Sequence, residues 1–121
     1  MSYSAKTIFA FGVYLFLLGV VFLLVPNMLL GLLQMPPTSE VWTRVAGMLL
    51  MGIGIYYFVA ALSEFRIFIV WTIPLRASVI LFFGAFVIAG LAPPVLLLLS
   101  AVDIAGALWT WSALRKETPK Q

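Results

Sequence analysis

The sequence predicts an all-α polytopic membrane protein, folded as a single transmembrane domain over residues 1–121. Of these residues 64% are hydrophobic and only 9% are charged, whereas soluble domains carry about 25% charged residues. So much apolar surface exceeds what a globular core of this length can bury. Lipid must therefore be the solvent for most of the chain, whose mean hydropathy is +1.19.

The apolar residues fall into four long runs, and a helix of about 20 such residues crosses the hydrocarbon core. We expect spans at about 8–25, 41–62, 74–91 and 95–114. The first ends at Pro26-Asn27, a helix-breaking pair. Residues 28–35 are too few to cross again, and either lie along the interface or extend the first helix past a proline kink. The result is a four-helix antiparallel bundle.

The third span is ambiguous because Arg76 interrupts the apolar run 67–91 just after Pro74. One interpretation is a single long helix, kinked at Pro74, with Arg76 near the middle of the bilayer. The other places residues 64–73 in the interface and starts the span near Pro74, since proline is tolerated in a first helical turn. We favour the second, in which Arg76 extends its side chain to the headgroups.

The basic residues predict the orientation. Arg44 is alone on one side of the membrane, and the other side holds the rest: Lys6, Arg66, Arg76, Arg115, Lys116 and Lys120. Because cytoplasmic loops carry the excess of Lys and Arg, both termini are expected in the cytoplasm. The expected location is the inner membrane of a cell, crossed several times.

Small residues recur at heptad-like intervals in all four spans. Those expected to let helices approach closely are Gly12, Gly19, Gly47, Gly54, Gly84 and Gly106. Close backbone contact at small residues supplies much of the association between helices in lipid. Short connections further predict that the second span packs against the third, and the third against the fourth.

Asp103 places a carboxyl group in the middle of the fourth span. Even on lenient insertion scales a charged side chain at such a depth costs about 2.5 to 3.5 kcal/mol. Helical spacing puts Ser100 and Thr110 on the same stripe, which we expect to face the bundle interior. Arg44 is the first choice as its ion-pair partner and Arg76 the second, with Tyr57 pointing inward from the second span. We interpret Asp103 and its arginine partner either as an ion pair that fixes helix register or as a ligand site.

Several kinds of chemistry are excluded by composition. The chain has no cysteine and no histidine, so disulfides, zinc sites and imidazole catalysis are ruled out. No paired acids, activated nucleophile or phosphate-binding glycine loop is present. We therefore expect no enzyme activity, no metal, no cofactor and no nucleic-acid partner; the excess of basic residues is typical of a membrane protein.

Three motifs resemble those of a known group. Trp42-Thr43-Arg44-x-x-Gly47 in the second span, with Asp103-x-x-Gly106-Ala107-Leu108-Trp109-Thr110 and Ala113-Leu114-Arg115 in the fourth, is similar to small bacterial four-helix membrane proteins. These are the DoxX-like proteins and related families of unknown function. The resemblance covers about residues 8–115 and implies a four-helix inner-membrane bundle. DoxX itself is associated with quinone-linked electron-transfer complexes, but no motif here carries that role across.

Three functions are compatible with these features. The first is a structural or accessory protein that acts as a homo-oligomer or with other membrane subunits. The second is binding or transport of a small hydrophobic or cationic molecule at Asp103, with Arg44 or Arg76 as counter-charge. The third is an enzyme acting on lipid or quinone, which has the least support because one carboxylate and several tyrosines are its only resources.

Overall fold

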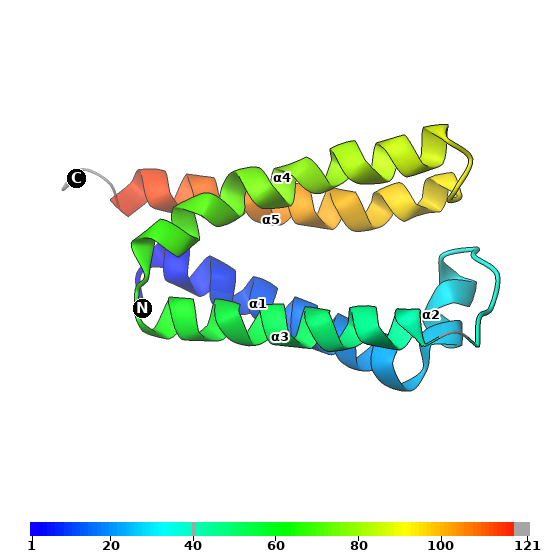
Figure 1. Ribbon diagram of the computed structural model, residues 1–121. Coiled ribbons are helices and arrows are strands. Elements are labelled where there is room, and N and C mark those ends of the chain that lie inside the picture. The colour runs from blue at the N-terminus through cyan, green and yellow to red at the C-terminus, as the bar shows by residue number, and fades with distance from the viewer. Residues whose placement is uncertain (40, 118–121) are drawn as a thin grey trace.

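The computed structural model describes residues 1–39 and 41–117, and these residues form helices and connecting loops without a β-strand. In chain order the helices are α1 (Tyr3–Leu24), α2 (Pro26–Leu32), α3 (Trp42–Leu62), α4 (Arg66–Ile88), the 3₁₀ turn η1 (Pro94–Leu96) and α5 (Leu97–Glu117). Four of the described helices are long and apolar enough to cross a membrane. The protein is thus an all-α, multi-pass membrane protein, and the start of α1 and the end of α5 lie at the same end of the bundle (Figure 1).

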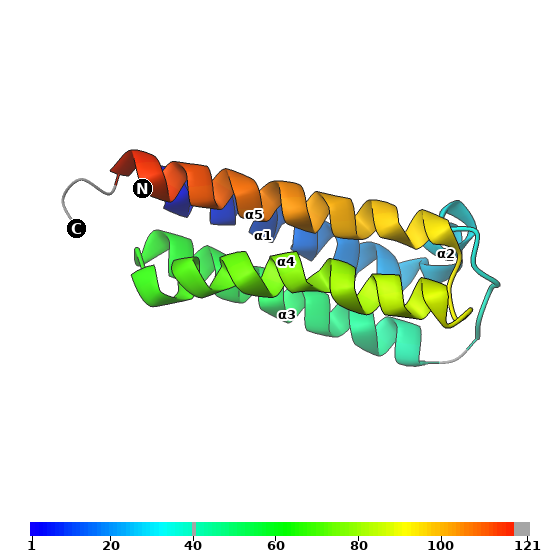
Figure 2. The same ribbon diagram turned by 90° about the horizontal axis from the view of Figure 1, so that it is seen from above.

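The four long helices are arranged as two antiparallel pairs. Helix α3 packs along α1, and α4 packs along α5. The pairs are joined mainly through α1 and α5, which lie side by side (Figure 2). The two helix pairs converge at the end where α1 begins and draw apart toward the end that holds α2 (Figure 1).

The expected packing of the second span on the third is largely absent. Helices α3 and α4 are joined by a short loop, yet they contact each other only sparsely. The reason is that α3 packs against α1 instead, with glycines of the two helices in contact. Helix α4 then packs against α5. The side of the bundle between α3 and α4 is therefore open.

The contact between α1 and α3 depends on four glycines. A Cβ atom at Gly19 would lie 2.6 Å from the carbonyl oxygen of Gly47, and one at Gly12 would lie 3.1 Å from that of Gly54. Since the neighbouring atoms belong to backbone, neither helix could accommodate a side chain there without moving apart. Gly84 differs from these four, because a Cβ there would meet nothing within 4 Å. The close contact expected at Gly84 is not made.

Helix α4 corrects the favoured interpretation of the third span. The helix begins at Arg66, runs through Pro74 and continues to Ile88. Proline lacks only one backbone donor and is tolerated inside membrane helices. A start at Arg66 keeps the apolar run in one helix up to Ile88, so the helix does not begin near Pro74. Arg76 consequently lies about 15 Å along the helix from Arg66, at 1.5 Å per residue, and not at its end.

The segment after the first span forms a separate short helix. Val25 has φ −136° and ψ 60°, which are not helical angles, and it separates α1 from α2. Pro26 and Leu30 of α2 are buried against the bundle, as is Leu33 just beyond it. The seven-residue α2 therefore packs beside the end of the bundle where the two helix pairs draw apart (Figure 1).

Candidate ligand-binding groove

A groove of about 1020 Å³ lies between the two helix pairs. Its walls come from α1, α3, α4 and α5, with residues of α2 and the adjoining loop at one end. Aromatic side chains are prominent among the lining residues: Phe11, Tyr14, Phe22, Trp42, Tyr56, Tyr57, Phe68, Trp71, Phe83 and Phe86. Arg76 and Asp103 are the charged members of the described lining. The site is thus an apolar groove with two opposite charges set into its wall.

Arg76 is buried, with only 4% of its surface exposed. Its Nε donates to the Thr72 carbonyl oxygen at 3.2 Å. Its Nη2 donates to the hydroxyls of Thr72 at 3.0 Å and Thr110 at 2.7 Å. The guanidinium also lies 4.7 Å from the centre of the Phe11 ring and 6.0 Å from that of Tyr57. Neutral oxygens and aromatic faces thus hold this cation in place.

The hydroxyl groups around Arg76 have a fixed direction of donation. Thr7 donates its hydrogen to the Ser4 carbonyl oxygen, 2.7 Å away. The 2.7 Å contact between the Thr7 and Thr110 hydroxyls therefore uses the hydrogen of Thr110. Because arginine only donates, each threonine hydroxyl in this series of hydrogen bonds points its hydrogen away from Arg76. The series of hydrogen bonds connects α4, α5 and α1 through buried side chains.

One nitrogen of Arg76 is left over. Nη1 is buried and has no hydrogen-bond partner among the described residues. It lies against α5, since a Cβ at Gly106 would be 3.0 Å from it. Buried polar groups are normally paired, so Nη1 is an exception among the described residues, enclosed beside Gly106 and the Phe11 ring.

Asp103 lies one helical turn from Gly106 and lines the groove, half-buried. It interacts electrostatically with Arg76. Nevertheless, the hydrogen bonds of Arg76 go to threonine oxygens and not to this carboxylate. The two charges are close enough to balance each other, but the described structure gives them no direct hydrogen bond.

The expected first choice of partner for Asp103 is not found. Arg44 is exposed, and its Nη1 donates to the carbonyl oxygen of Leu23 in the last turn of α1. Its position follows from the pairing of α3 with α1, which carries Arg44 away from α5. A cation beside a helix C-terminus interacts favourably with the free carbonyl groups there. The pair Arg44–Asp103 is thus replaced by an Arg44–α1 contact.

The remaining predicted residues divide between the groove and the helix contacts. Tyr57 lines the groove and is 7% exposed. Thr110 is fully buried and bonds Arg76, as described above. Ser100 is also fully buried, but its hydroxyl donates to the Leu97 carbonyl oxygen of its own helix at 2.7 Å. Gly106 packs against Phe11 and Arg76.

Sequence reasoning missed Thr72, which holds Arg76 together with Thr110, and Thr7, whose hydroxyl accepts from Thr110. Both hydroxyls satisfy a carbonyl three residues back in their own helix, so an isolated helix has no need to pair them. The available signal was their helical position: Thr72 lies four residues before Arg76, on the same face.

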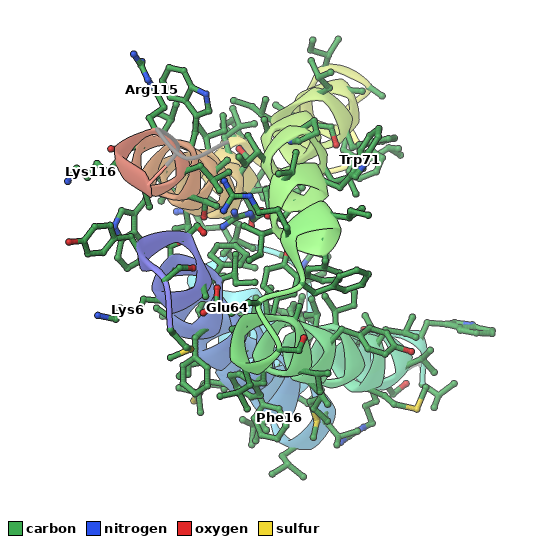
Figure 3. All side chains as sticks on the ribbon, turned by 90° about the vertical axis from the view of Figure 1, so that its left-hand side faces the viewer. Lys6, Phe16, Glu64, Trp71, Arg115 and Lys116 are labelled. Carbon is green, nitrogen blue, oxygen red and sulfur yellow. The ribbon has the colours of Figure 1, made fainter. Side chains whose placement is uncertain are left out.

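Other charged residues are spread over the end of the bundle where α1 begins, among them Lys6, Glu64, Arg115 and Lys116 (Figure 3). Glu64 accepts hydrogen bonds from the backbone nitrogen and the hydroxyl of Ser2, each at 2.7 Å. These bonds hold the pKa of the Glu64 carboxyl group below its usual range. The contact ties the N-terminus to the loop between α3 and α4.

The fold and the groove together define a multi-pass helical membrane protein with a buried charged site. Comparison with protein-family models, with curated proteins and with solved structures finds no match. The function is therefore argued from the groove.

Proposed function

We propose that the protein binds a small lipophilic molecule, which enters from the bilayer between α3 and α4 and places its polar group beside Arg76 and Asp103. The observation that carries this proposal is the Asp103 carboxyl group, which lines an apolar groove beside the buried Arg76 and makes no hydrogen bond to it among the described residues. A mostly apolar pocket with a few convergent polar groups is the usual form of a small-molecule site, and a volume near 1020 Å³ suits one.

The energetics of the two charges support a binding role. Each intramembrane charge costs about 2.5 to 3.5 kcal/mol even on lenient scales. A charge pair whose only purpose was to fix helix register would be expected to make a direct, fully bonded contact. Here Arg76 is held by threonines instead, so the Asp103 carboxylate is left facing the groove.

An accessory role is the second candidate, in which the protein works as an oligomer or as a subunit of a larger complex. The open side between α3 and α4 favours it, because a transmembrane helix from another subunit would cover the same apolar residues. The two candidates differ in what fills the groove.

We also propose that both termini lie in the cytoplasm and that the membrane is the bacterial inner membrane. Lys6, Arg66, Arg115 and Lys116 lie at or near the ends of helices on the side of the termini, and Arg44 lies toward the opposite side. The positive-inside rule supports this orientation. Lys120, counted with them from the sequence, is outside the described residues. The resemblance to DoxX-like proteins supports the inner membrane.

Native mass spectrometry of the protein extracted in mild detergent tests the binding proposal. We expect the wild-type protein to retain a lipophilic molecule in a one-to-one ratio and Asp103→Asn to lose it. Gly52→Ala is the matched control, because a Cβ at Gly52 meets nothing within 4 Å. It should keep the molecule. A wild-type protein that carries a second subunit and no small molecule would favour the accessory role.

A further inference from the structure

We infer that the bound molecule has a small, uncharged head group that donates a hydrogen bond to the Asp103 carboxylate, as a hydroxyl or an amide N–H group does. This inference rests on the proposed binding function and specifies the class of ligand.

The donor requirement comes from Asp103. Its carboxylate lines the groove and makes no hydrogen bond to another described residue. A carboxylate is an acceptor only, and an acceptor in apolar surroundings is costly to leave unpaired. A molecule that binds beside Asp103 must therefore bring an O–H or N–H group.

Arg76 leaves this requirement unmet. Its Nε and Nη2 donate to Thr72 and Thr110, and its Nη1 is enclosed beside Gly106 and Phe11. The guanidinium balances the charge of Asp103 without bonding it. The hydrogen bond to the carboxylate is left to the ligand.

Two tyrosines complete the surroundings of this acceptor. Tyr14 of α1 and Tyr57 of α3 line the groove and interact electrostatically with Asp103. Their ring centres lie 5.3 and 5.8 Å from that of Phe11, and neither hydroxyl bonds another described residue. Because a phenol both donates and accepts, these hydroxyls suit donors and acceptors alike. Discrimination between ligands therefore falls to Asp103.

The head group is uncharged for two reasons. Arg76 and Asp103 already balance each other, so an ammonium would leave an excess positive charge in an apolar environment, which is strongly disfavoured. Asp103 also lies about 9 Å along α5 from its first residue, Leu97, at 1.5 Å per residue. A molecule that reaches this depth from the bilayer carries its head through hydrocarbon, where a charge is costly.

The groove also places the apolar part of the ligand. From the level of Asp103 the lining continues toward α2 through Leu18 and Phe22 of α1 and Phe83 and Phe86 of α4. The helix pairs draw apart in that direction (Figure 1). The tail therefore extends between them toward α2.

Three single-chain amphiphiles of one chain length test the inference: an alcohol, its methyl ether and an ammonium. The ether keeps the oxygen of the alcohol but cannot donate. Dissociation constants are measured by calorimetry with the protein in an uncharged detergent. We expect the alcohol to bind the wild-type protein at least about tenfold more tightly than the ether or the ammonium, because only the alcohol is an uncharged donor to the carboxylate.

Variants assign this preference to Asp103. In Asp103→Asn the ether can accept from the new amide, so the ratio of the ether and alcohol dissociation constants should fall to about one. Asp103→Glu keeps the carboxylate and should keep the preference for the alcohol. Tyr14→Phe removes a hydroxyl that either compound can use, so the ratio should stay as in the wild type.

The inference on the head group would be overturned if the ether or the ammonium bound the wild-type protein as tightly as the alcohol. An undiminished preference for the alcohol in Asp103→Asn, with helix content unchanged by circular dichroism, would overturn it too. Both results leave the binding function standing. Failure of the alcohol to bind would overturn the inference if the extracted protein retains a lipophile, and the binding function itself if it retains none.

Discussion

Nη2 of Arg76 donates a 2.7 Å hydrogen bond to the Thr110 hydroxyl on the neighbouring helix, and this bond decides what Asp103 is free to do. Because Thr72 and Thr110 satisfy two of the guanidinium nitrogens, Arg76 keeps its place without a bonded carboxylate. The carboxylate remains at the groove. The hydroxyl of Thr110 thus takes the place of the carboxylate as a partner of Arg76, so that Asp103 is left available to a ligand.

Thr110→Val tests this relationship. Valine keeps the shape of the side chain but removes the acceptor for Arg76 and the donor to Thr7. We expect a loss of about 1 to 2 kcal/mol in unfolding free energy, since a buried charged donor loses its partner. Titration with a denaturing detergent, followed by circular dichroism, measures it. Thr110→Ser retains the hydroxyl and should lie close to wild type; equal losses in both variants would contradict the role of the hydroxyl.

Gly106→Ala tests the packing of Arg76 and Phe11, two residues of the groove lining, against α5. The added Cβ would lie 3.0 Å from Nη1 and 2.9 Å from Cδ1 of Phe11, so the guanidinium and the ring must shift. We expect weaker retention of the bound lipophile, measured by native mass spectrometry. Gly84→Ala, where a Cβ meets nothing within 4 Å, should retain it as the wild type does. Undiminished retention in Gly106→Ala would argue against a ligand that depends on the positions of Arg76 and Phe11.

Gly47→Ala tests the contact between α1 and α3. The Cβ would come within 2.6 Å of the Gly19 carbonyl oxygen and 2.7 Å of the Leu23 nitrogen, both of them backbone atoms. Overpacking of this kind costs about 1 to 3 kcal/mol, which the same denaturation assay can resolve. Gly52→Ala lies on the same helix with open space around it and should be neutral. A neutral Gly47→Ala would mean that α1 and α3 are less closely packed.

Arg44→Ala separates Arg44 from the groove. Its hydrogen bond goes to Leu23 at the end of α1, and the side chain is exposed. We expect a loss of about 0.3 to 1 kcal/mol, typical of a cation at a helix C-terminus, and no change in ligand retention. Loss of the ligand in this variant would restore Arg44 as the partner of Asp103.

The Ser2–Glu64 contact predicts a dependence of stability on pH. Since the pKa of Glu64 is lowered in the folded protein, its contribution is fully present above the unfolded value of about 4.3 and is lost as the pH falls through the folded value. Glu64 is exposed, so solvent keeps the effect small. Melting temperatures of wild type and Glu64→Gln should differ near neutral pH and converge below about pH 4. A difference that persists unchanged in acid would contradict this account.

The sequence alone was sufficient for the all-α class and for four helices long and apolar enough to cross a membrane. Both features follow from local hydropathy, and neither depends on which helix lies beside which. The continuity of α4 through Pro74 was harder to predict, because proline is tolerated both in a first helical turn and inside a membrane helix.

Tertiary structure decided the partners of the charged residues. The pairing of α3 with α1 takes Arg44 to the end of α1, and the pairing of α4 with α5 brings Arg76 to Thr110. Residues of three helices meet around Arg76, and their side chains lie close only after those helices have packed. The sequence showed that Asp103 needs a counter-charge in lipid. Only the pairing of the helices shows that Arg76 is this counter-charge, that threonines hold Arg76 in place, and that the Asp103 carboxylate faces the groove.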